Sequence, residues 1–284
     1  MNIRAVRTKI KSVGSVKKIT QAMQLISAIK MRKAQQKALE SQPYQDLIKK
    51  SIHKITKKIE KNASKLLIPA PASANRDLAI VITSNKGLAG AFNINLVRLL
   101  DRNINIKNTD LITSGKKGSL ILNSMGANII ADFSSDFPFD NISAIFNLAL
   151  KKFFDGEYRT VSIYYNKFIS SLKYEPLKEV LLPFVFPGED GAEKQVNYNY
   201  LIEPSPEEVI DQLLKSYIEE KIRYAMIQNE AGEHSARMIA MKNATDNASE
   251  VIYNLTLLRN QLRQQKITYE LLDMITAKES VENL

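Results

Sequence analysis

The sequence predicts an α/β protein in which long N- and C-terminal helices pair as an antiparallel coiled coil around an inserted Rossmann-like α/β domain. Both chain ends carry apolar residues at steps of three or four, which is typical of amphipathic helices. All nine prolines lie between positions 43 and 206. In that middle part, short apolar runs alternate with helical patterns, which favours a mainly parallel sheet. We expect a helix with its extension over 1–67, the α/β domain over 68–204 and a helix over 205–284.

The N-terminal helix is predicted over residues 1–42, which contain no proline and one glycine. Its apolar positions are Ile3, Val6, Ile10, Val13, Val16, Ile19, Met23, Ile26 and Ile29. The spacing slips between Val13 and Val16, where two three-residue steps meet, and such a slip overwinds a coiled coil locally. We expect Pro43 to kink or interrupt the helix before a second helical pattern runs over 44–67.

The middle of the chain is predicted to form the α/β domain. Its first strand is the apolar run over 77–83, which has the composition of a strand buried on both faces. The other expected elements are a helix over 91–101, a strand near 110–113, a helix ending at Met125, a helix over 142–154 and a strand over 160–165. The polar segment 189–198 is expected to be a surface loop.

The C-terminal helix has a strong predicted start. Ser205 can cap it, Pro206 suits its first turn, and Glu208 can complete a capping box. Its expected seam is Met241, Ala244, Ala248, Val251, Leu255, Leu258, Leu262, Gln265, Tyr269 and Leu272, with alternating steps of three and four. A helix continuing to about Thr276 would be roughly 105 Å long at about 1.5 Å per residue. Since no domain of this chain could bury that length, we expect it to project.

Composition excludes several kinds of site. The chain of 284 residues has no cysteine, which rules out disulfides and thiolate metal ligands. Its two histidines, His53 and His234, are too few for the metal or acid–base sites that we considered. No apolar run has the roughly 18 residues of a membrane span. We predict no catalytic, cofactor-binding or metal-binding residue. We expect an intracellular, soluble protein, which is compatible with a place on a membrane complex.

Two alternatives start from local patterns. The glycines at 87 and 90 and those at 115 and 118 follow predicted strands, as in phosphate-binding loops, but neither pair fits a known phosphate motif. We interpret both as turns, and a nucleotide-binding enzyme stays the alternative. Residues 1–65 hold 17 Lys or Arg against three acidic residues, which predicts an acidic partner. A nucleic-acid arm is disfavoured because residues 1–43 lack aromatic side chains for base stacking.

Several segments together resemble the family of ATP synthase gamma subunits. They are residues 3–13, 18–23, 30–35, 84–93, 165–168, 200–204 and 232–248. The last segment, GEHSARMIAMKNATDNA, is the most specific of them. Residues 267–273 match the start of the family's C-terminal signature, whereas Ala277 and Lys278 replace its usual Gly-Ala ending.

The resemblance implies a non-catalytic rotor shaft without a cofactor. The shaft would enter a ring of three alpha and three beta subunits, and the α/β domain would stand, with an epsilon subunit, on a membrane ring of c subunits. It would couple ion flow to binding changes at the catalytic sites and regulate ATPase activity, at the cytoplasmic face of the cell inner membrane. By matching motif positions, the expected contacts with the alpha/beta ring are Met23, Arg237, Arg263, Gln264, Thr268 and Glu270.

Overall fold

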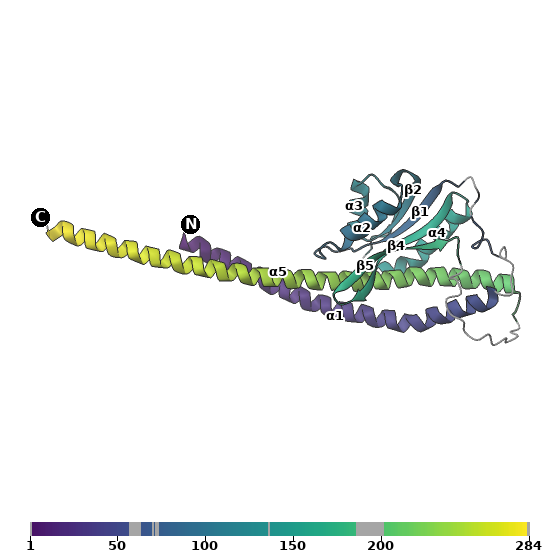
Figure 1. Ribbon diagram of the computed structural model, residues 1–284, viewed down its shortest axis with the longest axis horizontal. Helices are drawn as coiled ribbons and strands as arrows, with labels where there is room; N and C mark the ends of the chain where they lie inside the picture. The colour runs from purple at the N-terminus through teal and green to yellow at the C-terminus, as the bar shows by residue number, and fades with distance from the viewer. Residues whose placement is uncertain are drawn as a thin grey trace. The chain divides into compact units, whose positions relative to one another are not determined.

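The computed structural model describes residues 2–56, 64–69, 71, 74–135, 137–185 and 202–282. The two terminal helices are α1 (Ile3–Thr56) and α5 (Pro206–Glu282) (Figure 1). The chain groups into two compact units, one made of Met1–Ser27 with Arg237–Leu284 and the other of Ala28–Ala236. We call them the helix-pair unit and the α/β unit. Each long helix contributes to both units, and the domain boundaries expected at 67/68 and 204/205 stay predictions.

The α/β unit contains a five-stranded sheet with the order β3-β2-β1-β4-β5. The strands are β1 (Arg76–Ile82), β2 (Thr109–Ser114), β3 (Asn128–Asp132), β4 (Tyr158–Ser170) and β5 (Lys173–Leu182). β1 pairs in parallel with β2 and β4, and β2 pairs in parallel with β3. β5 forms an antiparallel hairpin with β4. The mainly parallel sheet is confirmed, and β3 and β5 are strands that we did not predict.

The predicted helices of the α/β unit are also present. They are α2 (Phe92–Asn103), α3 (Lys116–Ser124) and α4 (Ile142–Phe154), with short 3-10 turns η1 (Ile106–Asn108) and η2 (Pro138–Asn141). The bounds of α4 agree with those predicted, and those of α2 and α3 differ by one or two residues. The expected loop over 189–198 lies outside the described residues.

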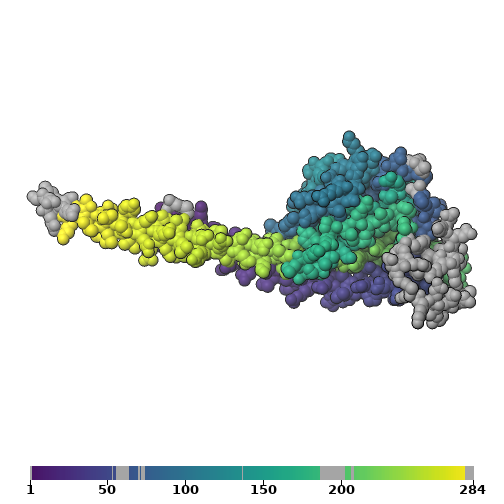
Figure 2. Space-filling view, viewed as in Figure 1, coloured from purple at the N-terminus to yellow at the C-terminus, as the bar shows by residue number. Residues whose placement is uncertain are grey.

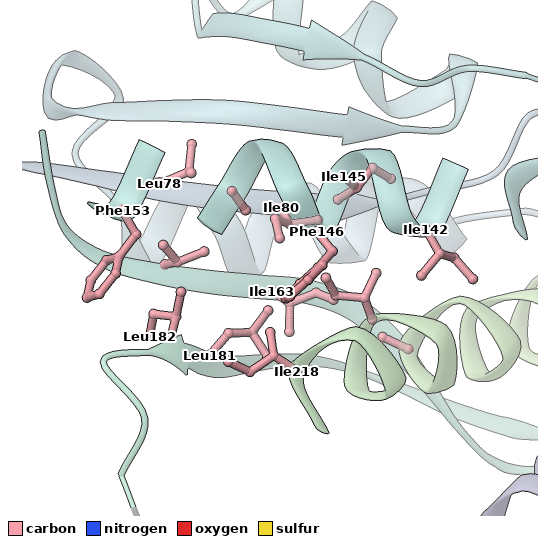
Figure 3. Packing of buried hydrophobic residues seen from close by; sticks show 14 of the residues in the cluster. Leu78, Ile80, Ile142, Ile145, Phe146, Phe153, Ile163, Leu181, Leu182 and Ile218 are labelled. Atoms are coloured by element: carbon pink, nitrogen blue, oxygen red, sulfur yellow. The ribbon is translucent and has the colours of Figure 1, made fainter. Parts of the chain in front are cut away.

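Both faces of the sheet are covered, as the apolar run of β1 predicted. Leu78, Ile80 and Ile82 join a cluster with α4 and α5, whereas Ala79 and Val81 face α2 and α3 on the other side. Figure 3 shows the first cluster, in which side chains from α4, the strands and α5 point toward one another. Each fully buried aliphatic side chain contributes about 1.5–3 kcal/mol to the hydrophobic stabilisation. The sheet thus holds one segment of α5 against its face.

The start of α5 agrees with its predicted cap. The Ser205 hydroxyl oxygen accepts a hydrogen bond from the Glu208 N–H at 3.3 Å. At the other end of the chain, α1 continues through Pro43, so the helix is not interrupted there, and the alternative of a kink at Pro43 stays a prediction. Pro43 is exposed, and its ring needs no space in the packed face of the helix. The helical pattern predicted over 44–67 is a helix up to Thr56, the last described residue before a gap. After the gap, residues 64–67 form a turn.

In the helix-pair unit the seam of α1 differs from the predicted one. The side chains that are fully or partly buried at alternating steps of three and four are Ile3, Val6, Ile10, Val13, Lys17, Thr20, Gln24 and Ser27. The predicted seam positions Val16, Ile19 and Ile26 are more than half exposed, as is Ile29 in the α/β unit. The helix keeps its even register past Val13 because small and polar side chains fit the seam, so the predicted slip does not occur.

The seam of α5 needs a similar correction. Its covered stripe is Met241, Thr245, Ala248, Ile252, Leu255, Arg259 and Leu262. The predicted positions Ala244 and Leu258 are partly covered as well, whereas Val251 is 45% exposed. The predicted continuation through Gln265, Tyr269 and Leu272 is wrong, because all three are exposed. Thr20 pairs with Thr245, and the helices run antiparallel (Figure 1). Ile3, the first residue of α1, then lies opposite about residue 262. The N-terminal end of α1 thus coincides with the end of the α5 seam.

Candidate functional site

One buried polar contact joins the two helices of the helix-pair unit. The hydroxyls of Thr20 and Thr245 lie 2.7 Å apart and share a hydrogen bond. The Thr245 hydroxyl also lies 2.8 Å from the Met241 carbonyl, as expected of threonine on a helix. Since a buried polar group in a coiled-coil seam stabilises the register in which it finds its partner, this pair aligns α1 against α5.

The outer surface of the helix pair exposes many large apolar side chains. On α1 these are Val16, Ile19, Leu25 and Ile26, and on the paired part of α5 they are Val251, Tyr253 and Leu257. Val16, Ile19 and Ile26 form a stripe on one side of the seam, which no described segment covers, and Leu25 lies on the other side. Contiguous exposed apolar surface on a soluble protein marks an interaction site. Sequence reasoning missed the stripe, because it assigned Val16, Ile19 and Ile26 to the seam.

No described helix lies beside the last part of α5. Every residue from 263 to 278 is exposed, and Figure 2 shows this yellow segment without another described segment over it on the visible face. We call residues 263–278 the tip. Its large apolar side chains are Ile267, Tyr269, Leu271, Leu272, Met274 and Ile275. They point in several directions around the helix, as expected for a segment that a partner encloses.

The six residues expected at a partner surface fall into two groups. Arg263, Gln264, Thr268 and Glu270 lie on the exposed tip. Met23 is partly buried beside the seam and Arg237 is 6% exposed. Arg237 and Arg263 are about 39 Å apart along the helix at about 1.5 Å per residue. The structure therefore groups four of the six residues and leaves the other two on a distant part of the helix pair.

Local contacts on the tip are weak and leave its polar groups accessible. The Thr268 hydroxyl donates to the Gln264 carbonyl at 3.0 Å, one helical turn earlier. Lys266 and Glu270 form an ion pair of 3.3 Å, with both side chains more than half exposed. Such pairs contribute about 0–1 kcal/mol and open readily. Glu270 and Thr268 can thus exchange these internal contacts for contacts with a partner.

The helix-pair unit is strongly basic on the α1 side. Residues 2–27 carry six Lys or Arg and no Asp or Glu. Five of the six, all except Lys17, are exposed. A surface with one sign of charge attracts a partner of the opposite sign and orients it before contact. The surface thus combines an apolar stripe with a cationic field.

The glycine turn at the start of α3 is bonded to the residues that follow β1. At the start of α3, the N–H groups of Lys116, Lys117 and Gly118 donate to Asn85 Oδ1, Ser84 O and Thr83 Oγ1 at 3.0–3.1 Å. These are the amides that a helix start would offer to a phosphate. Gly90 has φ 59°, which fits the turn that we predicted there. The first amides of α3 are therefore already bonded within the fold.

Two searches of the described residues complete the description of the surface. None of the described helices combines the length and the apolar character of a membrane span. Within the same residues, no three His, Cys, Asp or Glu side chains gather as a metal-binding group.

Solved structures with the same fold include chains of two mitochondrial ATP synthases. A chain of the Euglena gracilis mitochondrial ATP synthase, in a structure of OSCP, F1 and the c-ring, matches with a TM-score of 0.67 and 18% identity, covering 98% of this chain and 94% of that one. A chain of the Tetrahymena thermophila mitochondrial ATP synthase central stalk and c-ring matches with a TM-score of 0.59 and 23% identity, covering 80% and 99%.

Sequence comparisons give the family. A family profile described as ATP synthase matches residues 2–281. The ATP synthase gamma chain of Janthinobacterium sp. is 35% identical, covering 97% of this chain and 98% of the relative. That of Pelotomaculum thermopropionicum is also 35% identical, covering 99% of both. The chain belongs to the ATP synthase gamma chain family.

Proposed function

We propose that this chain is the non-catalytic central shaft of a rotary ATP synthase. The helix pair and the tip would turn inside a ring of three alpha and three beta subunits. The α/β unit, together with an epsilon subunit, would stand on the membrane ring of c subunits at the cytoplasmic face of the inner membrane. Rotation would couple ion flow to binding changes at the catalytic nucleotide sites, and in the reverse direction it would regulate ATPase activity.

The observation that carries this proposal is the tip of α5. A single helix of about 16 exposed residues with six large apolar side chains is unfavourable in water. A collar of partner subunits around it would remove that apolar surface from water. Apolar contact has little directional preference, so it can hold a turning axis without fixing one angle. The exposed apolar stripe of α1 extends the same kind of surface along the helix pair.

Charged and polar side chains would supply the dependence on angle. A shaft changes the state of a catalytic subunit only if it binds two conformations of that subunit with different affinity. The basic side of α1 and the polar residues of the tip differ around the axis, so each partner subunit would face a different surface at each angle. Exposed ion pairs are weak enough to form and break during a turn.

Assembly tests the proposal directly. We expect the tagged full-length chain, co-expressed with alpha and beta subunits, to purify in a complex that holds three of each per chain. ATP hydrolysis should require the alpha and beta subunits and should be absent from the chain alone. A chain that stays monomeric in their presence, or that hydrolyses ATP by itself, would contradict the proposed function.

The tip residues Arg263 and Gln264 are expected to contact loops of the surrounding subunits. An Arg263→Ala/Gln264→Ala variant should therefore assemble normally but lower ion-driven ATP synthesis by about ten-fold, the effect of losing two charge-assisted or polar hydrogen bonds. Synthesis by membrane vesicles is measured per assembled complex. The matched control is Asn260→Ala/Gln261→Ala, which removes two exposed polar side chains one turn earlier. Equal synthesis by both variants would count against the contact.

A further inference from the structure

β4 continues beyond the end of its neighbour β1 and leaves part of one strand edge without a strand partner. The last paired positions are Val81 of β1 and Tyr164 of β4, whereas β4 runs on to Ser170. In this stretch the Asn166 N–H donates to Asn229 Oδ1 of α5 at 3.3 Å. Two residues further, the Phe168 N–H donates to Gln228 Oε1 at 3.1 Å. Side-chain amides of a helix thus take the place of a neighbouring strand.

A third hydrogen bond follows at the hairpin between β4 and β5. The Ser235 hydroxyl of α5 donates to the Ser171 carbonyl at 2.8 Å. We call Gln228, Asn229 and Ser235 the α5 clamp. All three side chains are buried, with exposed fractions of 7% or less. Loss of the Asn229 side chain would leave the buried N–H of Asn166 without this partner, and the other two bonds are partly buried.

Gly232 lies between the clamp residues and allows α5 to approach closely. A side-chain carbon at this position would lie 3.1 Å from the ring of Phe92 and 3.6 Å from the Asn166 carbonyl. Phe92 in turn packs edge-to-face on Tyr174 of β5, with ring centroids 5.1 Å apart. The helix backbone is thus seated against α2, β4 and β5 at the point where its side chains bind the strand edge.

Hydrogen bonds and apolar packing resist different motions. An apolar helix face keeps most of its contact area when the helix rotates slightly or shifts along its axis. A hydrogen bond loses its energy when the donor angle or distance changes by a small amount. Three hydrogen bonds from the buried side chains at positions 228, 229 and 235 span two helical turns, so they oppose both rotation of α5 about its axis and sliding along it.

We propose that the α5 clamp is the torque-bearing joint between α5 and the sheet of the α/β unit. This inference rests on the proposed function, in which torque enters through the α/β unit and leaves through the helix pair. Gln228, Asn229 and Ser235 are positioning residues: they touch no nucleotide and act by keeping the angle of α5 constant against the sheet.

The test is a Gln228→Met/Asn229→Leu variant, which keeps side-chain volume and removes both hydrogen-bond acceptors. In the assembled membrane complex we expect ion-driven ATP synthesis per complex to fall about five-fold or more. ATP hydrolysis by the detached catalytic head should keep its wild-type rate, because it needs only the shaft segment inside the head. The ratio of the two rates is the readout, and a loss of stability alone would not change it.

A matched control separates coupling from stability. Tyr158→Phe removes a buried hydrogen bond of 2.6 Å to Asp110, which joins β4 to β2 and involves no side chain of α5. It should lower the melting temperature of the chain and keep the ratio of synthesis to hydrolysis. Amide hydrogen exchange supplies a readout that is independent of function. The N–H groups of Asn166 and Phe168 should exchange faster in the clamp variant than in the wild type. In Tyr158→Phe their exchange rates should stay at the wild-type values.

The proposal would be overturned if assembled complexes of the clamp variant kept the wild-type ratio of ATP synthesis to ATP hydrolysis while the amides of Asn166 and Phe168 exchanged fast. If the double variant does not assemble, Ser235→Ala removes one bond of the clamp with almost no change of volume, and an unchanged ratio there overturns the proposal equally. Failure of the proposed function looks different, because the wild-type chain would then not assemble with alpha and beta subunits at all.

Discussion

Replacing Gly115 by alanine is expected to destabilise the α/β unit by more than about 4 kcal/mol, which is exceptional for one substitution. Gly115 has φ 117°, a conformation that residues with a side chain rarely adopt. The new Cβ would lie 2.3 Å from the Thr83 carbonyl oxygen. Thr83 cannot move away without loss, because its N–H donates to the Ser114 carbonyl at 2.7 Å.

Thermal and denaturant unfolding of the purified chain measure this effect. A loss of that size corresponds to a fall in melting temperature of at least about 10 °C. Gly126→Ala is the matched control, because Gly126 also has positive φ, at 75°, but its added Cβ would meet no atom within 4 Å. It should lose only about 1–2 kcal/mol from the backbone conformation. Equal losses for both variants would contradict the steric argument.

Replacing Lys221 by methionine is expected to cost about 2–4 kcal/mol of folding stability. Lys221 Nζ lies 2.8 Å from Glu179 Oε2, and the Tyr165 hydroxyl donates to the other carboxylate oxygen at 2.6 Å. Both charged side chains are roughly three-quarters buried, with 28% and 26% exposed. Removing one partner leaves an uncompensated charge in a poorly hydrated site, which is what makes breaking such pairs expensive.

The loss should depend on pH. Burial alone would raise the pKa of Glu179, but the ammonium group of Lys221 and the hydroxyl of Tyr165 outweigh it and hold that pKa below its usual value. A lowered pKa in the folded state contributes stability above the unfolded-state pKa, and this contribution disappears as pH falls through the folded value. In Lys221→Met the effect of the Lys221 ammonium group is gone, and only the Tyr165 hydroxyl and the charge of Lys167 still oppose burial. The stability difference from wild type should therefore be largest near pH 7 and shrink toward about pH 4.

Melting curves of both proteins across this pH range check the expectation. The double variant Lys221→Met/Glu179→Gln should recover most of the lost stability at pH 7, because glutamine carries no charge and can still accept from Tyr165. A difference between wild type and Lys221→Met that is the same at every pH would show that lost packing, and not the uncompensated carboxylate, causes the effect.

Local patterns were sufficient for most elements of the α/β unit. The bounds of α4 and the strand character of β1 follow from short-range periodicity and from runs of apolar residues. The cap at Ser205 follows from the chemistry of three neighbouring residues. β5 was missed because it is an edge strand whose exposed and covered residues mix, with Val180 half-exposed and Leu181 buried. Its partner β4 decides its conformation.

The sequence could identify four residues of the candidate site, but it could not show how the six expected residues are arranged on the helix pair. The sequence could place Arg263, Gln264, Thr268 and Glu270 on the last turns of a long helix, where the structure exposes them. It could not show that Arg237 is buried, because burial on a paired helix depends on the other helix. The α5 clamp had no sequence signal, since Gln228 and Asn229 look like any polar residues of a helix.

By itself, the sequence determined that both chain ends are long helices, that an α/β sheet lies between them and which family the chain resembles. These properties arise from residues close together along the chain. Only the tertiary structure decided which side of each helix forms the seam. Val16 and Ile19 are as apolar as Val6 and Ile10, yet they lie outside it, because the pairing of Thr20 with Thr245 sets the register and thereby selects the face that is buried.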